Sequence, residues 1–286
     1  MATEPTGDHW TSEAYQNAAA FVPKLASKVL QWLDVQKDDV ILDVGCGDGV
    51  LDVEMAKVLA RGAGRVHGID SSAAMISAAQ EAARKAGLAD RCSFQVLDAA
   101  RLPRASALQS GAFTKAFSNA ALHWILRPPP DPAGSWAAVF DGVRGALAPG
   151  GTFVFEMGGL GNIAEIRAAL LAAVARRLPG GVAQAREADP WFFPDERWVR
   201  ETMEERVGGW KVERVEREWR PTEAERAGGV EGWVRLMGKK WFEALPEEEQ
   251  EACVKEVVEV LEEVCRQPGG GWMLGYVRLR AVARKI

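Results

Sequence analysis

Apolar positions in the first half of the chain fall alternately into short runs and helical stripes. Five short runs have the length and composition of strands, over residues 40–45, 65–70, 92–98, 112–120 and 152–157. Three segments between them are predicted as helices, over residues 50–61, 72–86 and 135–147. This regular alternation predicts a doubly wound α/β fold with a parallel sheet. Ligands bind such a sheet at the carboxyl ends of its strands, where the strand order reverses, here beside strands one and four.

The pattern differs at both ends of this region. A helix is predicted before the first strand, over residues 13–33, with Ser12 as its N-cap. After residue 158, helices are predicted over residues 163–178, 229–243 and 247–266. Alternation at period two predicts a half-exposed strand over residues 210–220, and a last strand is predicted over 272–285. No internal repeat or long linker is present, so the extra helices are expected to cap a single domain.

Composition narrows the class of protein. Of the 286 residues, 48% are hydrophobic, which is typical of a globular protein. The net charge of −5 gives no positive surface that would attract nucleic acid. The four cysteines have no metal-ligand spacing, so no metal site is predicted. No apolar run approaches the roughly 20 residues of a membrane span, and the first ten residues lack a signal-peptide layout. We therefore expect a cytoplasmic protein, monomeric or homodimeric, that acts on a small molecule.

The first predicted strand runs into a glycine-rich turn with the sequence Gly45-Cys46-Gly47-Asp48-Gly49. Its G-x-G-x-G spacing differs from the dinucleotide G-x-G-x-x-G and points to an adenosyl cofactor rather than a nicotinamide. Glycines let the backbone turn sharply and approach a ligand closely, and the helix from Val50 presents free N–H groups. Asp43, at the end of the strand, can accept hydrogen bonds from an ammonium group.

Acidic residues end the next two strands. Asp70 follows Gly49 by 21 residues and is placed to accept hydrogen bonds from both ribose hydroxyls of an adenosyl group, beside Ser71. Met75, in the following helix, is expected to face the adenine. Asp98 and Ala99, at the end of strand three, are expected to lie beside the adenine amino group.

The end of strand four is the remaining candidate region. Residues 118–125 read SNAALHWI, and Asn119 is expected to line the seam where cofactor and substrate meet. His123 titrates near neutral pH and is a candidate base or donor, and the Trp124 indole N–H can donate to a carboxylate. Neighbouring side chains of an extended segment point to opposite sides, so only one of the two enters the pocket, and Trp124 is favoured. Three aromatic residues after residue 158 are candidate substrate clamps: Trp191, Phe192 and Trp233.

With the motifs LDVGCGDG, GIDSS, LDA and SNAALHW in this order, the chain resembles class I S-adenosylmethionine-dependent methyltransferases. It is most similar to the trans-aconitate methyltransferase group, through IDSSAAMI, SNAALHWIL, the LPEEEQEACVKEVVEVLEE stretch and the final LRAVARK. The resemblance implies a seven-stranded sheet with the last strand antiparallel, a helical substrate lid, and S-adenosylmethionine as cofactor, with S-adenosylhomocysteine as product.

Residue roles follow from the resemblance. The glycine loop, here Asp43, Gly45, Cys46 and Gly47, would hold the methionine part. An N-terminal lid helix would fold over the cofactor and make Tyr15 a candidate residue near the methyl group. The resulting organisation is a single methyltransferase domain over residues 1–286. Its three parts are a lid helix (1–34), a cofactor-binding core (38–158), and cap helices with the final strands (159–286).

Methyl transfer from a sulfonium is an in-line displacement, in which the enzyme aligns the nucleophile and excludes water. A carboxylate nucleophile is ionised at neutral pH and needs no general base. We therefore expect a methyltransferase for a small molecule with an oxygen nucleophile, such as a carboxylate. C- or N-methylation, a non-catalytic adenosylmethionine-binding regulator and a nicotinamide dehydrogenase are the alternatives. The loops at 128–132 and 179–194 are enlarged relative to the trans-aconitate group, so the acceptor need not be trans-aconitate.

Overall fold

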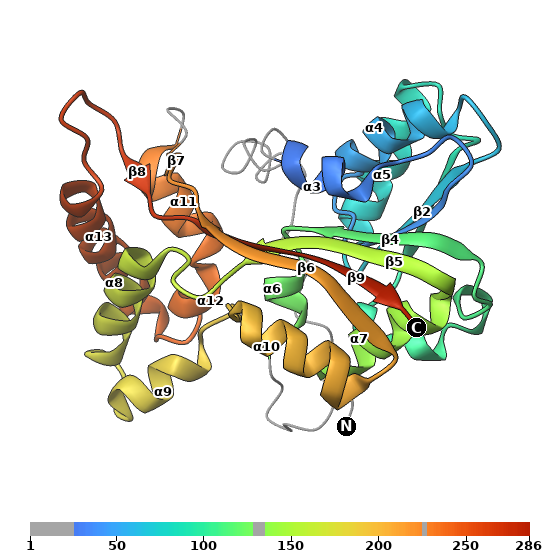
Figure 1. The fold of residues 1–286 in the computed structure, drawn as a ribbon. Helices are drawn as coiled ribbons and strands as arrows, with labels where there is room; N and C mark the ends of the chain where they lie inside the picture. The colour runs from blue at the N-terminus through green and yellow to red at the C-terminus, as the bar shows by residue number, and fades with distance from the viewer. Residues whose placement is uncertain (1–25, 128–134, 225–227) are drawn as a thin grey trace, which may run out of the picture.

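A computed structural model describes residues 26–127, 135–224 and 228–286, and its central feature is a seven-stranded sheet (Figure 1). The strands are β1 (Val40–Val44), β2 (Arg65–Asp70), β3 (Cys92–Val96), β4 (Phe113–Asn119), β5 (Leu147–Gly158), β6 (Trp210–Trp219) and β9 (Val277–Lys285). Their order is β3-β2-β1-β4-β5-β9-β6. The first five run parallel, and β9 is antiparallel to both of its neighbours. The predicted fold class, with the last strand antiparallel, is confirmed.

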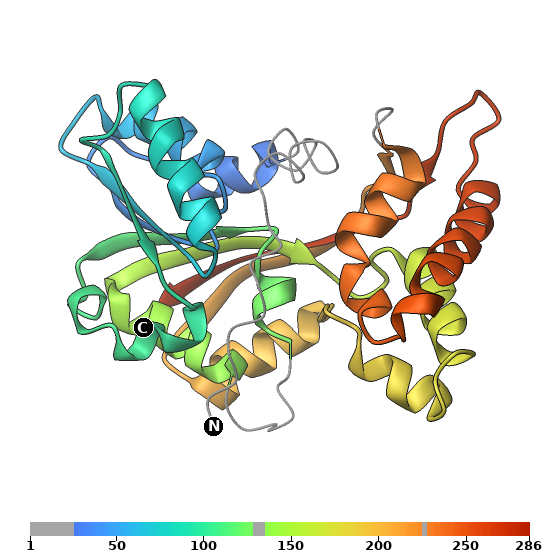
Figure 2. The ribbon, with the colours of Figure 1, turned by 180° about the vertical axis from the view of Figure 1, so that it is seen from behind.

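Helices cover both faces of this sheet, as Figures 1 and 2 show from opposite sides. One face is covered by α3 (Ser27–Leu33), α4 (Val50–Leu59) and α5 (Ala73–Lys85), and the other by α6 (Leu122–Ile125), α7 (Ser135–Ala146) and α10 (Glu196–Arg200). Strand β5 explains why the apolar runs are continuous. Val154 packs toward α3 and α4, whereas Phe153 and Phe155 pack toward α7, so successive residues need apolar side chains on opposite faces.

A second group of helices lies beyond the carboxyl ends of the parallel strands (Figure 1). It contains α8 (Ala164–Ala175), α9 (Gly181–Glu187), α11 (Gly229–Met237), α12 (Lys239–Phe242), α13 (Glu247–Val264) and the two short strands β7 (Thr222–Glu223) and β8 (Met273–Leu274). These elements share their own hydrophobic core, which includes Leu170, Trp241 and Val257. We call them the cap. None of the helices in the described ranges is long and apolar enough to cross a membrane.

Several element boundaries differ from the sequence-based expectation. The helix predicted over 229–243 divides at Gly238, and the strand predicted over 272–285 divides at Gly275. Glycine at these positions weakens regular structure because it has the largest backbone entropy to lose. The helix predicted over 13–33 is described only from Ser27 onward. Helices α6, α9 and α10, and a π-helical segment over Glu201–Val207, were not predicted.

Candidate functional site

A cavity of about 410 Å³ opens at the carboxyl ends of β1, β2 and β4. It therefore lies where the strand order reverses, between β1 and β4. Ten of the predicted site residues line it: Gly45, Cys46, Gly47, Asp70, Ser71, Met75, Asp98, Ala99, Asn119 and Trp124. These residues lie at or after the carboxyl ends of four strands, because Asp98 and Ala99 follow β3, and the sheet brings them together.

The glycine loop forms one wall of the cavity. Gly45, Gly47 and Gly49 have φ angles of +77°, +56° and +75°, a region that side chains other than glycine rarely adopt. A Cβ atom on Gly45 would lie 2.3 Å from the Ala121 Cβ, so this position also needs the absence of a side chain. The N–H groups of Gly45 and Cys46 donate to the Ile69 carbonyl at 2.8 and 3.1 Å, which fixes the loop against β2.

Asp70 ends β2 at the rim of the cavity. Its Oδ2 accepts the Gly47 N–H at 3.0 Å and its Oδ1 accepts the Ser72 N–H at 2.9 Å. A carboxylate has about four acceptor positions, so both oxygens keep capacity for hydroxyl groups of a ligand. The Ser72 hydroxyl accepts the Met75 N–H at 3.1 Å and caps α5, which starts the helix so that Met75 lies in the cavity wall.

Further residues of the cavity wall lie at the ends of β3 and β4, on either side of the β2–β1 pair. Asp98 is exposed, and its Oδ1 accepts the Ala100 N–H at 2.9 Å, which caps a short 3₁₀ helix over Ala99–Arg104. Asn119 lines the cavity, and its Oδ1 is buried without a hydrogen-bond partner among the described residues. A buried acceptor without a donor is costly, so a ligand donor here would be stabilising.

Trp124 and His123 occupy a helical turn, α6, and not the extended segment that we expected. Trp124 lines the cavity. His123 does not: its side chain is buried, and its Nδ1 accepts the Gly158 N–H at 3.3 Å. Burial, with the nearby positive charge of Arg278, holds the pKa of His123 well below its usual value, so the imidazole is neutral. The structure therefore does not bring His123 to the site as a base.

The three cap aromatics also lie away from the cavity. Trp191 is buried, parallel to Phe193 at 6.2 Å and edge-on to Trp124 at 5.6 Å between ring centroids. Trp233 is buried and donates its Nε1–H to the Tyr276 hydroxyl at 2.7 Å. Phe192 packs edge-on against Trp198 of α10. The cap and the sheet use these rings as core, so the expectation that they clamp the substrate is not met. Tyr15, the remaining candidate, lies outside the described residues.

Asp43 does not line the cavity but lies beneath the glycine loop, where it is only 2% exposed. It faces Asp52, on the first turn of α4, which is 0% exposed. Burial and the like charge of Asp52 raise the pKa of Asp43 well above its usual range, and burial raises that of Asp52 to about 7. The sequence analysis missed Asp52. The signal in the sequence that could have identified Asp52 is an acidic residue within the apolar stripe of α4.

Within the described ranges, no group of three side chains is arranged to hold a metal ion.

Comparison with known proteins agrees with this geometry. A family model described as a methyltransferase domain matches residues 35–190. The chain is 36% identical to an uncharacterized methyltransferase of Schizosaccharomyces pombe over 280 residues, which cover 97% of this chain and 98% of the relative.

Two solved structures share the fold. A protein of Bacillus halodurans has a TM-score of 0.58 at 13% identity, over 92% of this chain and 99% of its own. The YcgJ protein of Bacillus subtilis has a TM-score of 0.57 at 14% identity, over 90% of this chain and 96% of its own.

The cavity suits an adenosyl sulfonium cofactor. Its polar groups include the glycine-loop backbone, the Asp70 carboxylate and the Asn119 Oδ1, which has no partner among the described residues, and its apolar groups include Met75 and Ile125. These are the acceptors and the apolar surface that a ribose, an ammonium group and an adenine ring require. The chain belongs to the methyltransferase-domain family and is a methyltransferase that uses S-adenosylmethionine.

Proposed function

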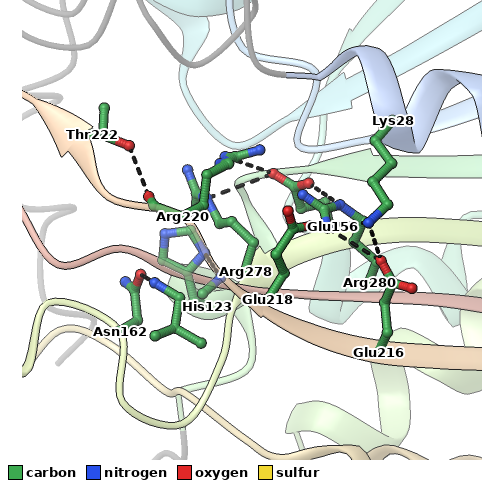
Figure 3. A network of polar contacts seen from close by, with 12 residues as sticks. Lys28, His123, Glu156, Asn162, Glu216, Glu218, Arg220, Thr222, Arg278 and Arg280 are labelled. Carbon is green, nitrogen blue, oxygen red and sulfur yellow. Dashed lines mark hydrogen bonds and ion pairs between the residues drawn. The ribbon is translucent and has the colours of Figure 1, made fainter.

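We propose that this enzyme methylates an oxygen of a small molecule that carries a carboxylate group. The observation that carries the proposal is a cluster of buried guanidinium groups beyond the Asn119 and Trp124 end of the cavity. The cluster contains Arg278 and Arg280 on β9 and Arg220 directly after β6, and all three meet at Glu156 on β5 (Figure 3).

The cofactor is assigned first, because its orientation sets the direction of transfer. In this assignment, Asp70 binds the ribose, Met75 and Ala99 contact the adenine beside Asp98, and the glycine loop holds the methionine part with the charge of Asp43 beneath it. S-adenosylmethionine supplies an electrophilic methyl group on its sulfonium. This orientation directs that methyl toward the β4 end of the cavity, where Asn119 and Trp124 lie.

Sheet register connects the guanidinium cluster to this end of the cavity. Asn119 on β4 is the register partner of Glu156 on β5, and Glu156 is the partner of Arg280 on β9. Lateral partners in a sheet project to the same face. The cluster therefore shares a sheet face with Asn119 and lies to its side, toward the cap.

Charge balance within the cluster favours an anionic ligand. Arg280 pairs with Glu156 and Glu218, and Lys28 pairs with Glu216 and Glu218. Arg214 also pairs with Glu216. Counting these residues with Arg220 and Arg278, five cations face three carboxylates, so positive charge is in excess within this described set.

Arg278 is the member with the weakest compensation. Arg278 is only 2% exposed, and its Nε lies 3.6 Å from the Glu156 Oε1. This Nε–H has no hydrogen-bond acceptor among the described residues. Arg220 already donates to that same oxygen at 3.1 Å. Burial lowers the pKa of Arg220 despite the attraction of Glu156, and the neighbouring charges of Arg278 and Arg280 lower it further. A carboxylate on the acceptor would relieve this excess of positive charge.

Among the described residues, no histidine, lysine or tyrosine lines the cavity, and a carboxylate acceptor needs none. A carboxylate is ionised at neutral pH and attacks without losing a proton, unlike a phenol or an amine. Neutral, buried His123 could not take part without moving, whereas the Trp124 indole lies in the cavity wall, where it can orient an acceptor oxygen. The residues of this chain would then mainly align the acceptor and exclude water.

The test is a methyl-transfer assay with labelled S-adenosylmethionine and a panel of mono- and dicarboxylic acids, phenols and amines. Methyl esters are the expected products. Exclusive transfer to nitrogen or carbon of uncharged acceptors would reject the carboxylate acceptor while leaving the methyltransferase activity in place.

Arg278→Gln is expected to raise the KM for the acid acceptor by about 10- to 100-fold, because a charge-assisted hydrogen bond contributes about 1.5–3 kcal/mol. Binding of S-adenosylhomocysteine, measured by calorimetry, should change little. Arg284→Gln is the matched control, since Arg284 lies on the same strand but pairs with Glu213 on the surface. An unchanged KM in Arg278→Gln, with normal circular dichroism, would exclude Arg278 from acceptor binding.

A further inference from the structure

Two buried carboxyl groups lie in contact beneath the glycine loop. Asp43, on β1, is 2% exposed and Asp52, on α4, is 0% exposed, and each carboxyl group acts on the pKa of the other. Among the described residues, Asp43 Oδ1 and both Asp52 oxygens receive no hydrogen bond from any N–H or O–H donor. Two ionised carboxylates offer only acceptors, so neither could satisfy the buried oxygens of the other, whereas a pair that holds one proton contains a donor. Burial of both groups without other donors therefore favours one proton shared by the pair.

The surroundings of the pair add negative charge and no compensating cation. Asp70, at the end of β2, acts on Asp43, and Asp48, in the glycine loop, acts on Asp52. The Cys46 thiol is close to Asp43 and Asp52, and burial raises its pKa well above the usual value, so it stays neutral. Neither Asp43 nor Asp52 forms an ion pair with a lysine, arginine or histidine in the described ranges. Low local polarity and like charges both favour the protonated pair.

We propose that Asp43 and Asp52 share one proton in the free enzyme, and that the cofactor's ammonium group displaces this proton into solvent when the cofactor binds. The inference rests on the proposed function, which assigns the methionine part of the cofactor to the glycine loop. Gly45 and Gly47 line the cavity, and the peptide chain from Asp43 leads directly into them. A positive charge held at this wall would stabilise the doubly ionised pair.

The direction of the pH dependence follows from linkage. Wherever the free enzyme holds the shared proton, cofactor binding must release it, and the raised pKa values of Asp43 and Asp52 extend this range toward neutral pH. Affinity therefore rises with pH by up to about tenfold per unit while the free pair is protonated and levels off once it is ionised. Asp52 acts here through Asp43 and is a positioning residue, because it does not line the cavity.

Calorimetry of S-adenosylhomocysteine binding to the full chain tests this without any turnover. S-adenosylhomocysteine carries the same ammonium group. At each pH, the binding enthalpy is measured in several buffers that differ in ionisation enthalpy. The slope of the measured binding enthalpy against the buffer ionisation enthalpy gives the number of protons released. We expect up to about one proton released between pH 6 and 7, and fewer as the pH rises and the free pair ionises. Binding without proton release between pH 6 and 7 would overturn the proposal using wild-type protein alone.

Asp52→Asn identifies the group that holds the proton. The amide keeps the shape of the side chain and can donate a hydrogen bond to Asp43, which then stays ionised. Proton release is expected to disappear and the affinity to become nearly constant from pH 6 to 8. Glu54→Gln is the matched control on the exposed face of α4 and should retain wild-type proton release.

The outcomes of this experiment separate the inference from the proposed function. Unchanged proton release in Asp52→Asn would assign the proton to another group and reject the pair. Complete absence of S-adenosylhomocysteine binding by wild-type protein would reject the cofactor placement and, with it, this inference. Binding with the expected proton release, lost only in Asp52→Asn, supports both.

Discussion

Replacing Glu156 with glutamine is expected to lower the free energy of unfolding by about 3–5 kcal/mol. Glu156 is 1% exposed and is the shared partner of Arg220, Arg278 and Arg280. Glutamine has almost the same shape, so packing is kept while the negative charge is lost. The buried guanidinium groups then face one another without their common counter-charge. Leaving buried charges unpaired costs far more stability than an ion pair on the surface contributes. Urea denaturation monitored by fluorescence measures the change.

A surface ion pair on the same strands provides the control for Glu156→Gln. Glu213→Gln removes the partner of Arg284, and both side chains are well exposed to solvent. It is expected to cost less than about 1 kcal/mol. If Glu156→Gln also cost less than this, the cluster would be adequately solvated, and its excess charge could not serve as an argument for an anionic acceptor.

The parts of the fold that depend on local pattern could be predicted from the sequence. Strand β1, the glycine loop and α4 follow from an apolar run, a set of glycines and a helical stripe, and each signal lies within a few residues. Asp70 was predicted at the ligand end of β2 because a parallel sheet places the carboxyl ends of its strands along one edge. The switch point between β1 and β4 follows from the same topology.

The parts that depend on tertiary contacts could not be predicted in the same way. Glu156, Arg220 and Arg278 come from strands far apart in sequence, and the alternation of charge along β6 is equally typical of a solvated face. Only the register of β5, β9 and β6 shows that these charges meet under α3. The four-residue helix α6 was also missed, because it is too short for a periodic signal, and it decides that Trp124 faces the cavity and His123 does not.

Aromatic residues show a second limit of sequence reasoning. Trp191 and Trp233 suit a ligand pocket and a hydrophobic core equally well, since both use large flat apolar surfaces. The cap forms its own core beyond the sheet, and these two rings are part of it. The sequence does not show that the cap needs its own core, so it cannot decide whether these rings fill that core or line a pocket.

Replacing Asp70 with alanine is expected to weaken cofactor binding by about 2–4 kcal/mol, or about 30- to 1000-fold. In the proposed placement the variant loses two charge-assisted hydrogen bonds to the ribose hydroxyls. It also leaves the Gly47 and Ser72 N–H groups without the acceptor that they have in the structure, so the glycine loop is held less firmly. Calorimetry with S-adenosylhomocysteine measures the loss, and Asp90→Ala, on an exposed turn, should bind like wild type.

Asp70→Asn separates the charge of this residue from its geometry. The amide keeps one acceptor oxygen that can serve either a ribose hydroxyl or the Gly47 N–H, so a loss intermediate between wild type and Asp70→Ala is expected. Equal losses in the two variants would mean that the full carboxylate is needed at this position. Wild-type affinity in Asp70→Ala would mean that the ribose binds elsewhere in the cavity. The adenine and the methyl would then have to be placed anew, and the direction of transfer toward Trp124 and the arginine cluster would lose its basis.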